Sequence, residues 1–463
     1  MLNLRRPRTS LSSNSYYSSR KKKNNLPKPV LLAAIPATFL LAELGLRVFA
    51  GVTGQSAELD AYVGEPAIVN AYQLKPLSES GKPIQGMPGQ GKLAVVDSPL
   101  TGYRLLPNQT NKMLQINGQG FRATQDLTLE KPQNEVRIFV LGGSTAFGKM
   151  VSSNATTFTQ QLETRLNQQV QNQKQNLKQF RPDVLPYFAD ELEKALRLPP
   201  KIRDAQYRVI NAAVPGYSSG NSLSQLTAQI LQYQPDMIVL VNGYDDLLLP
   251  SDQEAGSLGI SNAIAENATG RFVSHLTGGI QRFFWNFYLI KSIPYWITKP
   301  EPTVEAIVDH HNHSNQALRD RIPEDKELER RVKQYQQNLQ KVARISQAAK
   351  IPLLVSLQPE LSQRSNLSEN EKRILQSLGD QYKQRIQTAY QTMSKALESL
   401  KKSSPGLLIV KLTDSYNKLP GDAFQDTIHL TDEAQQVMGD RLYEVIAPRL
   451  QVQPKPFNGN APV

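Results

Sequence analysis

The feature of this sequence that most constrains its fold is an alternation of short apolar runs with long amphipathic segments after Pro132. The runs are rich in Val, Ile and Leu and have the length of strands. They lie at residues 136–141, 207–210, 237–241, 352–357 and 407–412. Continuous apolar strands that alternate with helices predict a mostly parallel sheet with helices on both faces, which is an α/β fold.

The segments between these runs have helical periodicity. Phe158, Leu162, Leu166 and Val170 recur every four residues and predict one apolar helix face. Further predicted helices cover roughly residues 222–232, 327–349, 369–400 and 432–450. Two stretches break the alternation and predict insertions near 171–205 and 250–325. The predicted domain therefore extends over residues 131–451 and is followed by a tail at 452–463.

The N-terminal region is basic and then apolar. Residues 1–29 hold eight Lys and Arg residues and no acidic residue, and residues 30–42 carry no charge. Extending the apolar stretch to residue 50 reaches the ~20 residues that cross a bilayer, but includes Glu43 and Arg47, which can pair on one helix face. Basic residues before an apolar stretch predict a cytoplasmic N-terminus and an exported body. We interpret residues 30–50 as a transmembrane signal anchor, with a cleaved signal peptide or a buried core helix as alternatives.

Composition excludes several classes of protein. The chain has 463 residues and no cysteine, which rules out disulfides, cysteine-based zinc sites and a thiol nucleophile. Removing the eight basic charges of residues 1–29 lowers the net charge from +12 to +4, so the charge belongs to a basic tail and we expect no nucleic-acid partner. Residues 51–130 include a stretch rich in Gly and Pro and predict a linker and irregular extension. The histidine-rich run at 309–313 predicts a solvated loop and no metal site.

A serine stands where the first strand ends. Ser144 follows Gly142 and Gly143 directly. In a parallel sheet the chemistry takes place at the carboxyl ends of the strands, and glycines there permit a tight turn. Ser144 can therefore present its hydroxyl and its backbone N–H to a bound group. The span from Gly143 to Lys149 also spells the start of a phosphate-binding loop, but Met150 stands where that motif needs Ser or Thr.

Three further polar clusters follow predicted strands or precede a predicted helix. Gly216 comes after the strand at 207–210, and its N–H is suited to a developing oxyanion. Asn242 ends the strand at 237–241 and is followed by Asp245. Asp426 and His429 lie three residues apart before the last helix, so a short turn can orient the imidazole against the carboxylate.

In order and context these clusters resemble the SGNH branch of the GDSL hydrolases, from about residue 134 to residue 451. The resemblance implies a flavodoxin-like three-layer α/β/α sandwich. It identifies Ser144 with the family's nucleophile, Gly216 with its second-block glycine, and Asp426 and His429 with its Asp-x-x-His pair. The segment at 117–125, NGQGFRATQ, is similar to a lead-in found in membrane-anchored members.

The third block departs from the family pattern. When the sequence is aligned on Gly243, Asp245 occupies the place of the family's Asn, whose amide donates to the oxyanion. An ionised carboxylate only accepts hydrogen bonds, and losing one such donor costs ~10²–10³ in rate. Asp245 is protonated in a buried site, or Asn242 supplies the amide, or the site is slow or inactive. The predicted oxyanion groups are Ser144, Gly216, Asp245 and Asn242.

The resemblance implies a serine esterase or acyltransferase that acts on acylated glycans, lipids or small esters. Ser144 would attack the ester, His429 would act as base and then as acid, and Asp426 would orient His429. This chemistry needs no cofactor and no metal. The alternative is a catalytically impaired SGNH-fold protein of the cell envelope that binds glycan or protein partners. Asp245 favours that alternative, and the complete Ser, His and Asp set opposes it.

Overall fold

The centre of the protein is a parallel sheet. The computed structural model describes residues 28–56, 59, 67–78, 80–82, 91–252, 287–292, 295–296, 318–404 and 406–457. Its main sheet has five strands in the order β10-β9-β8-β6-β7, and all their pairings are parallel. The strands are β6 (Glu135–Gly142), β7 (Gln206–Asn211), β8 (Met237–Asn242), β9 (Leu353–Leu357) and β10 (Leu408–Val410). The predicted strands are confirmed, and no bound moves by more than two residues.

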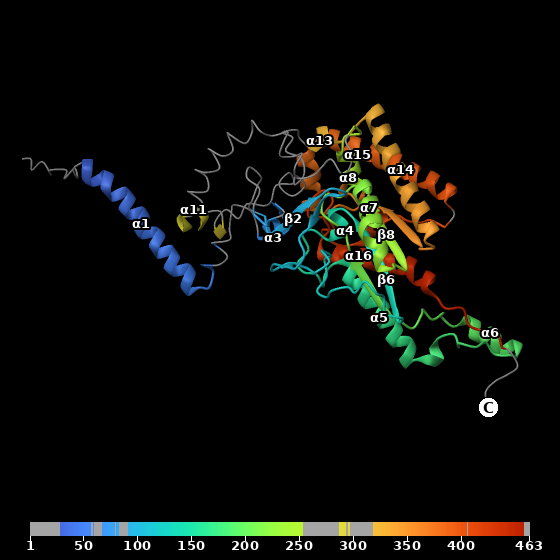
Figure 1. Cartoon of the computed structure of the whole chain (residues 1–463). Helices are drawn as coiled ribbons and strands as arrows, with labels where there is room; N and C mark the ends of the chain where they lie inside the picture. The colour runs from blue at the N-terminus through green and yellow to red at the C-terminus, as the bar shows by residue number, and fades with distance from the viewer. Residues whose placement is uncertain are drawn as a thin grey trace, which may run out of the picture.

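Helices cover both faces of this sheet and give three layers (Figure 1). Along β6, Ile138 and Val140 are buried against one helix layer, whereas Phe139 and Leu141 are buried against the other. This alternation explains why apolar residues stand on both faces of the run, since a strand covered on both faces has no solvent side. The first layer contains α5 (Phe158–Gln175) and α16 (Asp432–Ile446), and the second contains α7 (Ser219–Gln225), α14 (Asp325–Ala348) and α15 (Glu369–Ser403).

The helix α5 shows how local sequence and packing agree. The Thr157 side chain accepts a hydrogen bond from the Gln160 backbone N–H and caps the first turn. The four residues predicted to form its apolar face are all buried, and they are Phe158, Leu162, Leu166 and Val170. Burying a large apolar side chain contributes about 1.5–3 kcal/mol, so this face holds α5 on the sheet.

The prediction of a linker and irregular extension at 51–130 is wrong for much of that stretch. It contains the helix α3 (Ala67–Tyr72) and a small sheet of β1 (Leu74–Leu77), β2 (Leu93–Ser98) and β3 (Gly102–Leu105). Leu93, Val95 and Tyr103 are buried in the same cluster as Ile138 of the main sheet. The strands have only four to six residues each, which is too short for a clear pattern, and they gain their stability by packing on the core.

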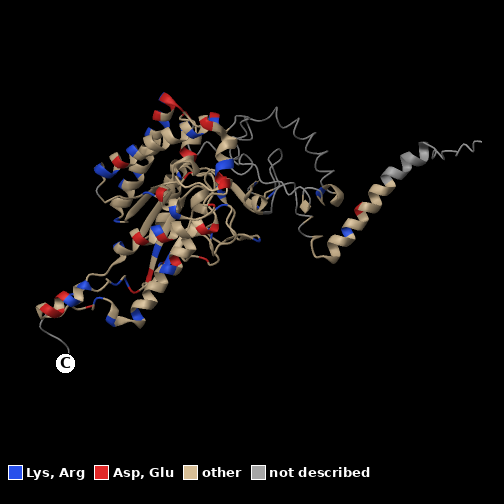
Figure 2. Cartoon of the chain, turned by 180° about the vertical axis from the view of Figure 1, so that it is seen from behind, with Lys and Arg blue, Asp and Glu red and all other residues tan. Residues whose placement is uncertain are grey.

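The helix α1 (Lys28–Val52) covers the predicted anchor but does not support a membrane span. Within the described residues, no helix combines the length and the apolar character that a membrane crossing requires. Acidic and basic positions interrupt the otherwise uncharged part of α1 in Figure 2. Within α1, Glu43 and Arg47 form an ion pair of 2.8 Å. Glu43 also accepts the backbone N–H groups of Tyr288 and Leu289, each at 2.9 Å. The predicted transmembrane helix at 30–50 is therefore corrected to a helix with a buried carboxylate on one side.

The two predicted insertions differ in how much of them the structure describes. The first contains the end of α5 and α6 (Ala189–Arg197), which extends away from the sheet (Figure 1). A bridge between Val184 and Lys455 joins this first insertion to the C-terminal tail. Most of the second insertion, with the histidine-rich run at 309–313, lies outside the described residues. The predicted domain limits remain predictions.

Candidate active site

The turn after β6 requires glycine. Gly142 has a φ of 147°, and a Cβ atom there would lie 2.1 Å from the Val241 carbonyl oxygen of the neighbouring strand β8. Gly143 is the N-cap of the four-residue helix α4 (Ser144–Phe147). The chain therefore turns sharply at the carboxyl end of β6 and places Ser144 at the start of α4, where it is 5% exposed.

The structure brings Ser144, His429 and Asp426 together. The Ser144 Oγ and the His429 Nε2 are 2.8 Å apart, and the His429 Nδ1 bonds to the Asp426 Oδ2. The Asp426 Oδ1 accepts the backbone N–H groups of Ile428 at 2.8 Å and of His429 at 2.7 Å. The Thr145 hydroxyl donates to the Ile428 carbonyl at 2.9 Å and so ties α4 to the loop that carries the histidine.

The electrostatics of this chain of contacts suit a general base. Burial alone would raise the pKa of Asp426, but His429 and the two backbone N–H groups lower it below its ordinary value. Burial lowers the pKa of His429, although Asp426 opposes this shift. Near pH 7 the imidazole is therefore neutral. Its Nδ1–H donates to Asp426, which leaves Nε2 free to accept the Ser144 proton.

The turn that carries Gly216 lies beside the turn that carries Ser144. Gly216 has a φ of 82°, a conformation that favours glycine. The Tyr217 carbonyl oxygen lies 3.1 Å from the position of a Cβ atom on Gly143. The Tyr103 hydroxyl donates to the Pro215 carbonyl at 2.6 Å and holds this turn in place. The short sheet that the sequence reading missed therefore supports the predicted oxyanion region.

Asp245 lies directly against the nucleophile turn. It is the second residue of α8 (Tyr244–Leu248), and its Oδ2 lies 2.3 Å from the position of a Cβ atom on Gly143. This oxygen is buried and has no hydrogen-bond partner among the described residues, although the side chain as a whole is part-exposed. Burial and then the neighbouring Asp246 raise the pKa of Asp245 to about 7, against the opposing effects of Lys149 and Arg321. A protonated Asp245 can donate a hydrogen bond from this place.

The Asn242 amide bonds to the turn around Tyr217. Its Nδ2 donates to the Tyr217 carbonyl at 3.2 Å and contacts the Ser222 Oγ at 3.4 Å. The side chain is 1% exposed and joins the end of β8 to the turn around Tyr217. Of the two residues predicted for the third oxyanion position, Asp245 is the one whose side chain borders Gly143.

The sequence reading missed three charged residues around the site. Lys149 is 3% exposed, and burial lowers its pKa to about 8 although Asp426 and Asp245 oppose the shift. Asp246 accepts hydrogen bonds from the Ser219 backbone N–H at 3.1 Å and from the Ser219 hydroxyl. Arg122 donates to the Phe147 and Gly148 carbonyls at 3.0 and 2.6 Å and so fastens the end of α4. Two sequence features could have pointed to such residues. Lys149 lies in the phosphate-loop-like spacing, and Arg122 lies in the segment at 117–125 that is similar to a family lead-in.

The fold and these contacts define an α/β protein of the SGNH hydrolase type. A family model described as GDSL-like Lipase/Acylhydrolase matches residues 138–442, which is more than half of the chain. The protein therefore belongs to the GDSL-like lipase/acylhydrolase family. Its five-stranded parallel sheet and helix layers are those expected of the SGNH hydrolase fold.

Several solved structures are similar over about two thirds of the chain. A putative lipolytic protein of the G-D-S-L family from Desulfitobacterium hafniense is 11% identical, with coverage of 67% of this chain and 99% of that chain and a TM-score of 0.32. The esterase EstA from Pseudoalteromonas sp. is 13% identical, with coverage of 68% and 98% and a TM-score of 0.32. The lipase/acylhydrolase from Enterococcus faecalis is 14% identical, with coverage of 69% and 98% and a TM-score of 0.33. No curated protein matches the sequence. The family assignment rests on the family model and not on these distant likenesses.

Proposed function

We propose that this protein is a serine esterase or acyltransferase that acts through an acyl-enzyme on Ser144. The observation that carries the proposal is the unbroken contact from the Ser144 Oγ through His429 to Asp426 at the carboxyl end of β6. Membership of an acylhydrolase family supports the same chemistry. A nucleophile, a base and a residue that orients the base are the three parts that this mechanism needs.

In the proposed first step, the Ser144 Oγ forms a bond to the ester carbonyl carbon while its proton passes to the His429 Nε2. The carbonyl π electrons move onto oxygen and give a tetrahedral oxyanion. When the intermediate collapses, the C–O bond to the alcohol breaks, and the imidazolium returns the proton to that alcohol. In the second step, water or a sugar hydroxyl attacks the acyl-enzyme with the same base. Hydrolase and transferase differ only in this acceptor.

For the oxyanion we propose three donors, the backbone N–H groups of Ser144 and Gly216 and the protonated carboxyl of Asp245. The position of the buried Asp245 Oδ2 beside Gly143 supports the third donor. This oxygen has no hydrogen-bond partner among the described residues, so when it is protonated it is available to donate to the oxyanion. The pKa of about 7 supports it further, since half of the carboxyls then carry a proton at that pH. A neutral carboxylic acid that donates to an oxyanion is an established device.

We propose esters of the cell envelope as the substrate class, namely acylated glycans, lipids or small acyl esters, and an exported catalytic domain. The basic tail of residues 1–29 ahead of an apolar stretch supports the location. Protease treatment of intact cells, with an epitope at the C-terminus, tests it. Loss of the epitope before the cells are opened is the expected result, and full protection would contradict an exported domain.

The test of the chemistry is labelling with a fluorophosphonate, which modifies an activated serine. We expect the full chain to be labelled and Ser144→Ala to lose the label completely. Ser152→Ala is the matched control, because Ser152 bonds to Asp432 and takes no part in the proposed reaction. Labelling of Ser144→Ala equal to that of the unmodified protein would overturn the proposal.

The alternative function is an envelope protein that binds its ligand without catalysis. The Asp245 side chain favours it, since an ionised carboxylate beside Gly143 repels an oxyanion. A folded protein that is not labelled from about pH 5 to about pH 9, with no rescue by Asp245→Asn, would favour this alternative over the enzyme.

A further inference from the structure

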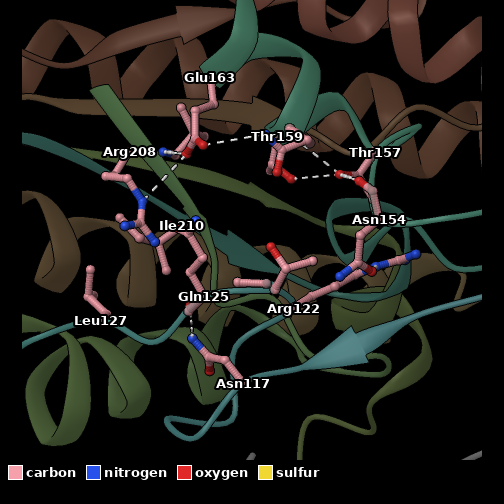
Figure 3. Close-up of a pocket in the computed structure, with 14 residues that line it drawn as sticks. Asn117, Arg122, Gln125, Leu127, Asn154, Thr157, Thr159, Glu163, Arg208 and Ile210 are labelled. Carbon is pink, nitrogen blue, oxygen red and sulfur yellow. Dashed lines mark hydrogen bonds and ion pairs between the residues drawn. The ribbon is translucent and has the colours of Figure 1, made fainter. Parts of the chain in front are cut away.

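A polar cavity lies at the edge of the main sheet, separate from the triad. Its volume is about 140 Å³, and its walls come from the segment around Arg122, the start of α5 and the edge strand β7 (Figure 3). Neither Ser144, His429 nor Asp426 lines it. A water needs only about 10–15 Å³ on this measure, so the cavity has room for several waters or for a small ligand.

Arg208 of β7 lines this cavity and pairs with Glu163 only at long range. Its side chain is only 16% exposed, and its Nε lies 3.9 Å from the Glu163 Oε2, beyond hydrogen-bond distance. In the described part of the chain, no closer acceptor faces this guanidinium. Among the described residues, no nitrogen of Arg208 is both fully buried and without a partner, so water in the cavity can reach the guanidinium. A ligand with acceptor oxygens can replace that water and bond to the guanidinium.

Glu163 cannot serve as the full partner of Arg208. Its Oε2 already accepts the Val209 backbone N–H at 2.7 Å, and its Oε1 accepts the Gln160 amide at 3.3 Å. Burial raises the pKa of Glu163, although the Val209 N–H and Arg208 oppose this shift. Both oxygens of Glu163 therefore accept hydrogen bonds from other groups, one on β7 and one on α5. The Arg208 guanidinium remains able to donate hydrogen bonds to a ligand.

Arg122 gives the opposite wall a second positive charge. Its guanidinium is held by the Phe147 and Gly148 carbonyls and by the Asn154 Oδ1 at 2.9 Å, so the charge is fixed in place. The cavity therefore holds two guanidinium groups against one carboxyl with a raised pKa. The amide of Gln125 and the hydroxyl of Thr124 add hydrogen-bonding groups to the wall. Such a site favours an anion with several acceptor oxygens.

We propose that this cavity binds a small oxyanion, a phosphate or a carboxylate, through bidentate hydrogen bonds from Arg208. The site is independent of the reaction at Ser144, so the proposal stands or falls separately from the proposed function.

Calorimetric titration of the full chain at constant ionic strength tests the proposal, with inorganic phosphate and acetate as separate probes. We expect saturable binding of at least one of them, and the tighter one identifies the anion class. Arg208→Gln should weaken binding by about 10-fold or more, the effect of losing charge-assisted hydrogen bonds. Arg441→Gln is the matched control, since Arg441 forms an exposed pair with Glu444, and its affinity should stay unchanged.

Two results would overturn the proposal. One is the absence of saturable binding of both anions to the unmodified protein. The other is equal affinity for the unmodified protein and a folded Arg208→Gln. If the melting curve shows that Arg208→Gln does not fold, Gln125→Ala replaces it, because Gln125 is exposed at the cavity rim. That variant should weaken binding by about 3-fold, and unchanged affinity would reject the site.

Discussion

Two aspartates near the ends of the neighbouring strands β6 and β8 differ in their hydrogen bonds and in the direction of their pKa shifts. Beside the end of β6, both oxygens of Asp426 are satisfied by His429 and by two backbone N–H groups, and the pKa of this carboxyl is lowered. After the end of β8, the Asp245 Oδ2 has no partner among the described residues, and the pKa of this carboxyl is raised to about 7. Burial acts on both carboxyls in the same direction, so the difference comes from the donors around them.

This difference separates two tasks in one site. A satisfied carboxylate keeps its charge and holds an imidazole in one orientation. An unsatisfied carboxyl keeps its proton up to neutral pH and can donate a hydrogen bond to a group that arrives with the substrate. The predictions below test whether the two aspartates hold these different tasks.

The largest effect is expected from Asp426→Asn. An amide in this place favours the wrong tautomer of His429, so kcat should fall by about 10⁴ with little change in fold. Hydrolysis of a chromogenic acetate ester measures it, with Asp414→Asn as a control, because Asp414 is exposed in a surface turn. A loss smaller than about 10-fold would show that Asp426 does not orient the base.

The second effect concerns Asp245 and the pH profile. For the unmodified protein, activity should rise with pH as His429 loses its proton below pH 6.5 and fall again above about pH 7 as Asp245 loses its own. Asp245→Asn keeps a donor at every pH, so its activity should not fall on the alkaline side. About two pH units above the pKa, the variant should exceed the unmodified protein by about 100-fold.

Asp246→Asn is the matched control for this experiment. Asp246 is the adjacent buried carboxyl, with a pKa raised by burial to about 6, but it bonds to Ser219 instead of facing Gly143. The alkaline fall should persist in this control but move to lower pH, because the Asp246 charge that raises the pKa of Asp245 is gone. Identical pH profiles for Asp245→Asn and the unmodified protein would reject the proposed donor.

The third effect is on stability. The pKa of Asp245 is about 7 in the folded protein against an ordinary value of 3.8, so the folded state binds its proton more tightly than the unfolded state. Stability from this group is therefore complete below about pH 4, falls as the pH rises to about 7, and is constant above that. Relative to Asp245→Asn, the unmodified protein should lose about 2–4 kcal/mol over this window.

Urea unfolding at several pH values measures this loss. The comparison with the variant removes the contributions of other buried groups such as Glu360, whose pKa burial raises to about 7. If the free energy of unfolding depends on pH in the same way for both proteins, the pKa of Asp245 is not raised by folding. That outcome would also weaken the case for a protonated donor.

The smallest effect is expected from Asn242→Ala. Its amide is committed to the Tyr217 carbonyl, so kcat should fall by less than about 10-fold, mainly through loosening of the neighbouring turn. A loss of about 10²–10³ at unchanged fold would instead make Asn242 the third oxyanion donor. The comparison of Asp245 and Asn242 at one pH therefore decides between the two readings of the third block.

The sequence was sufficient to predict the parts of the fold that depend on local pattern. The strands β6 to β10 are mostly apolar because both faces of the sheet are covered, and such runs are visible without a structure. The motif residues Ser144, Asp426 and His429 could be named because a strand end and an Asp-x-x-His turn mark them. In contrast, β1, β2 and β3 are short and are stabilised by long-range packing, which no local window contains.

What the sequence by itself determined is the order of strands and helices, the polar groups at the strand ends and the family. Only the tertiary structure decided which of these groups meet. The contact between Ser144 and His429 spans 285 positions in the chain and depends on how α4 and the histidine loop pack. The same holds for the position of the Asp245 Oδ2 against Gly143 and for the two arginines around the edge cavity. A pKa or a cavity depends on distance and burial, and both are set by packing between segments that are remote in sequence.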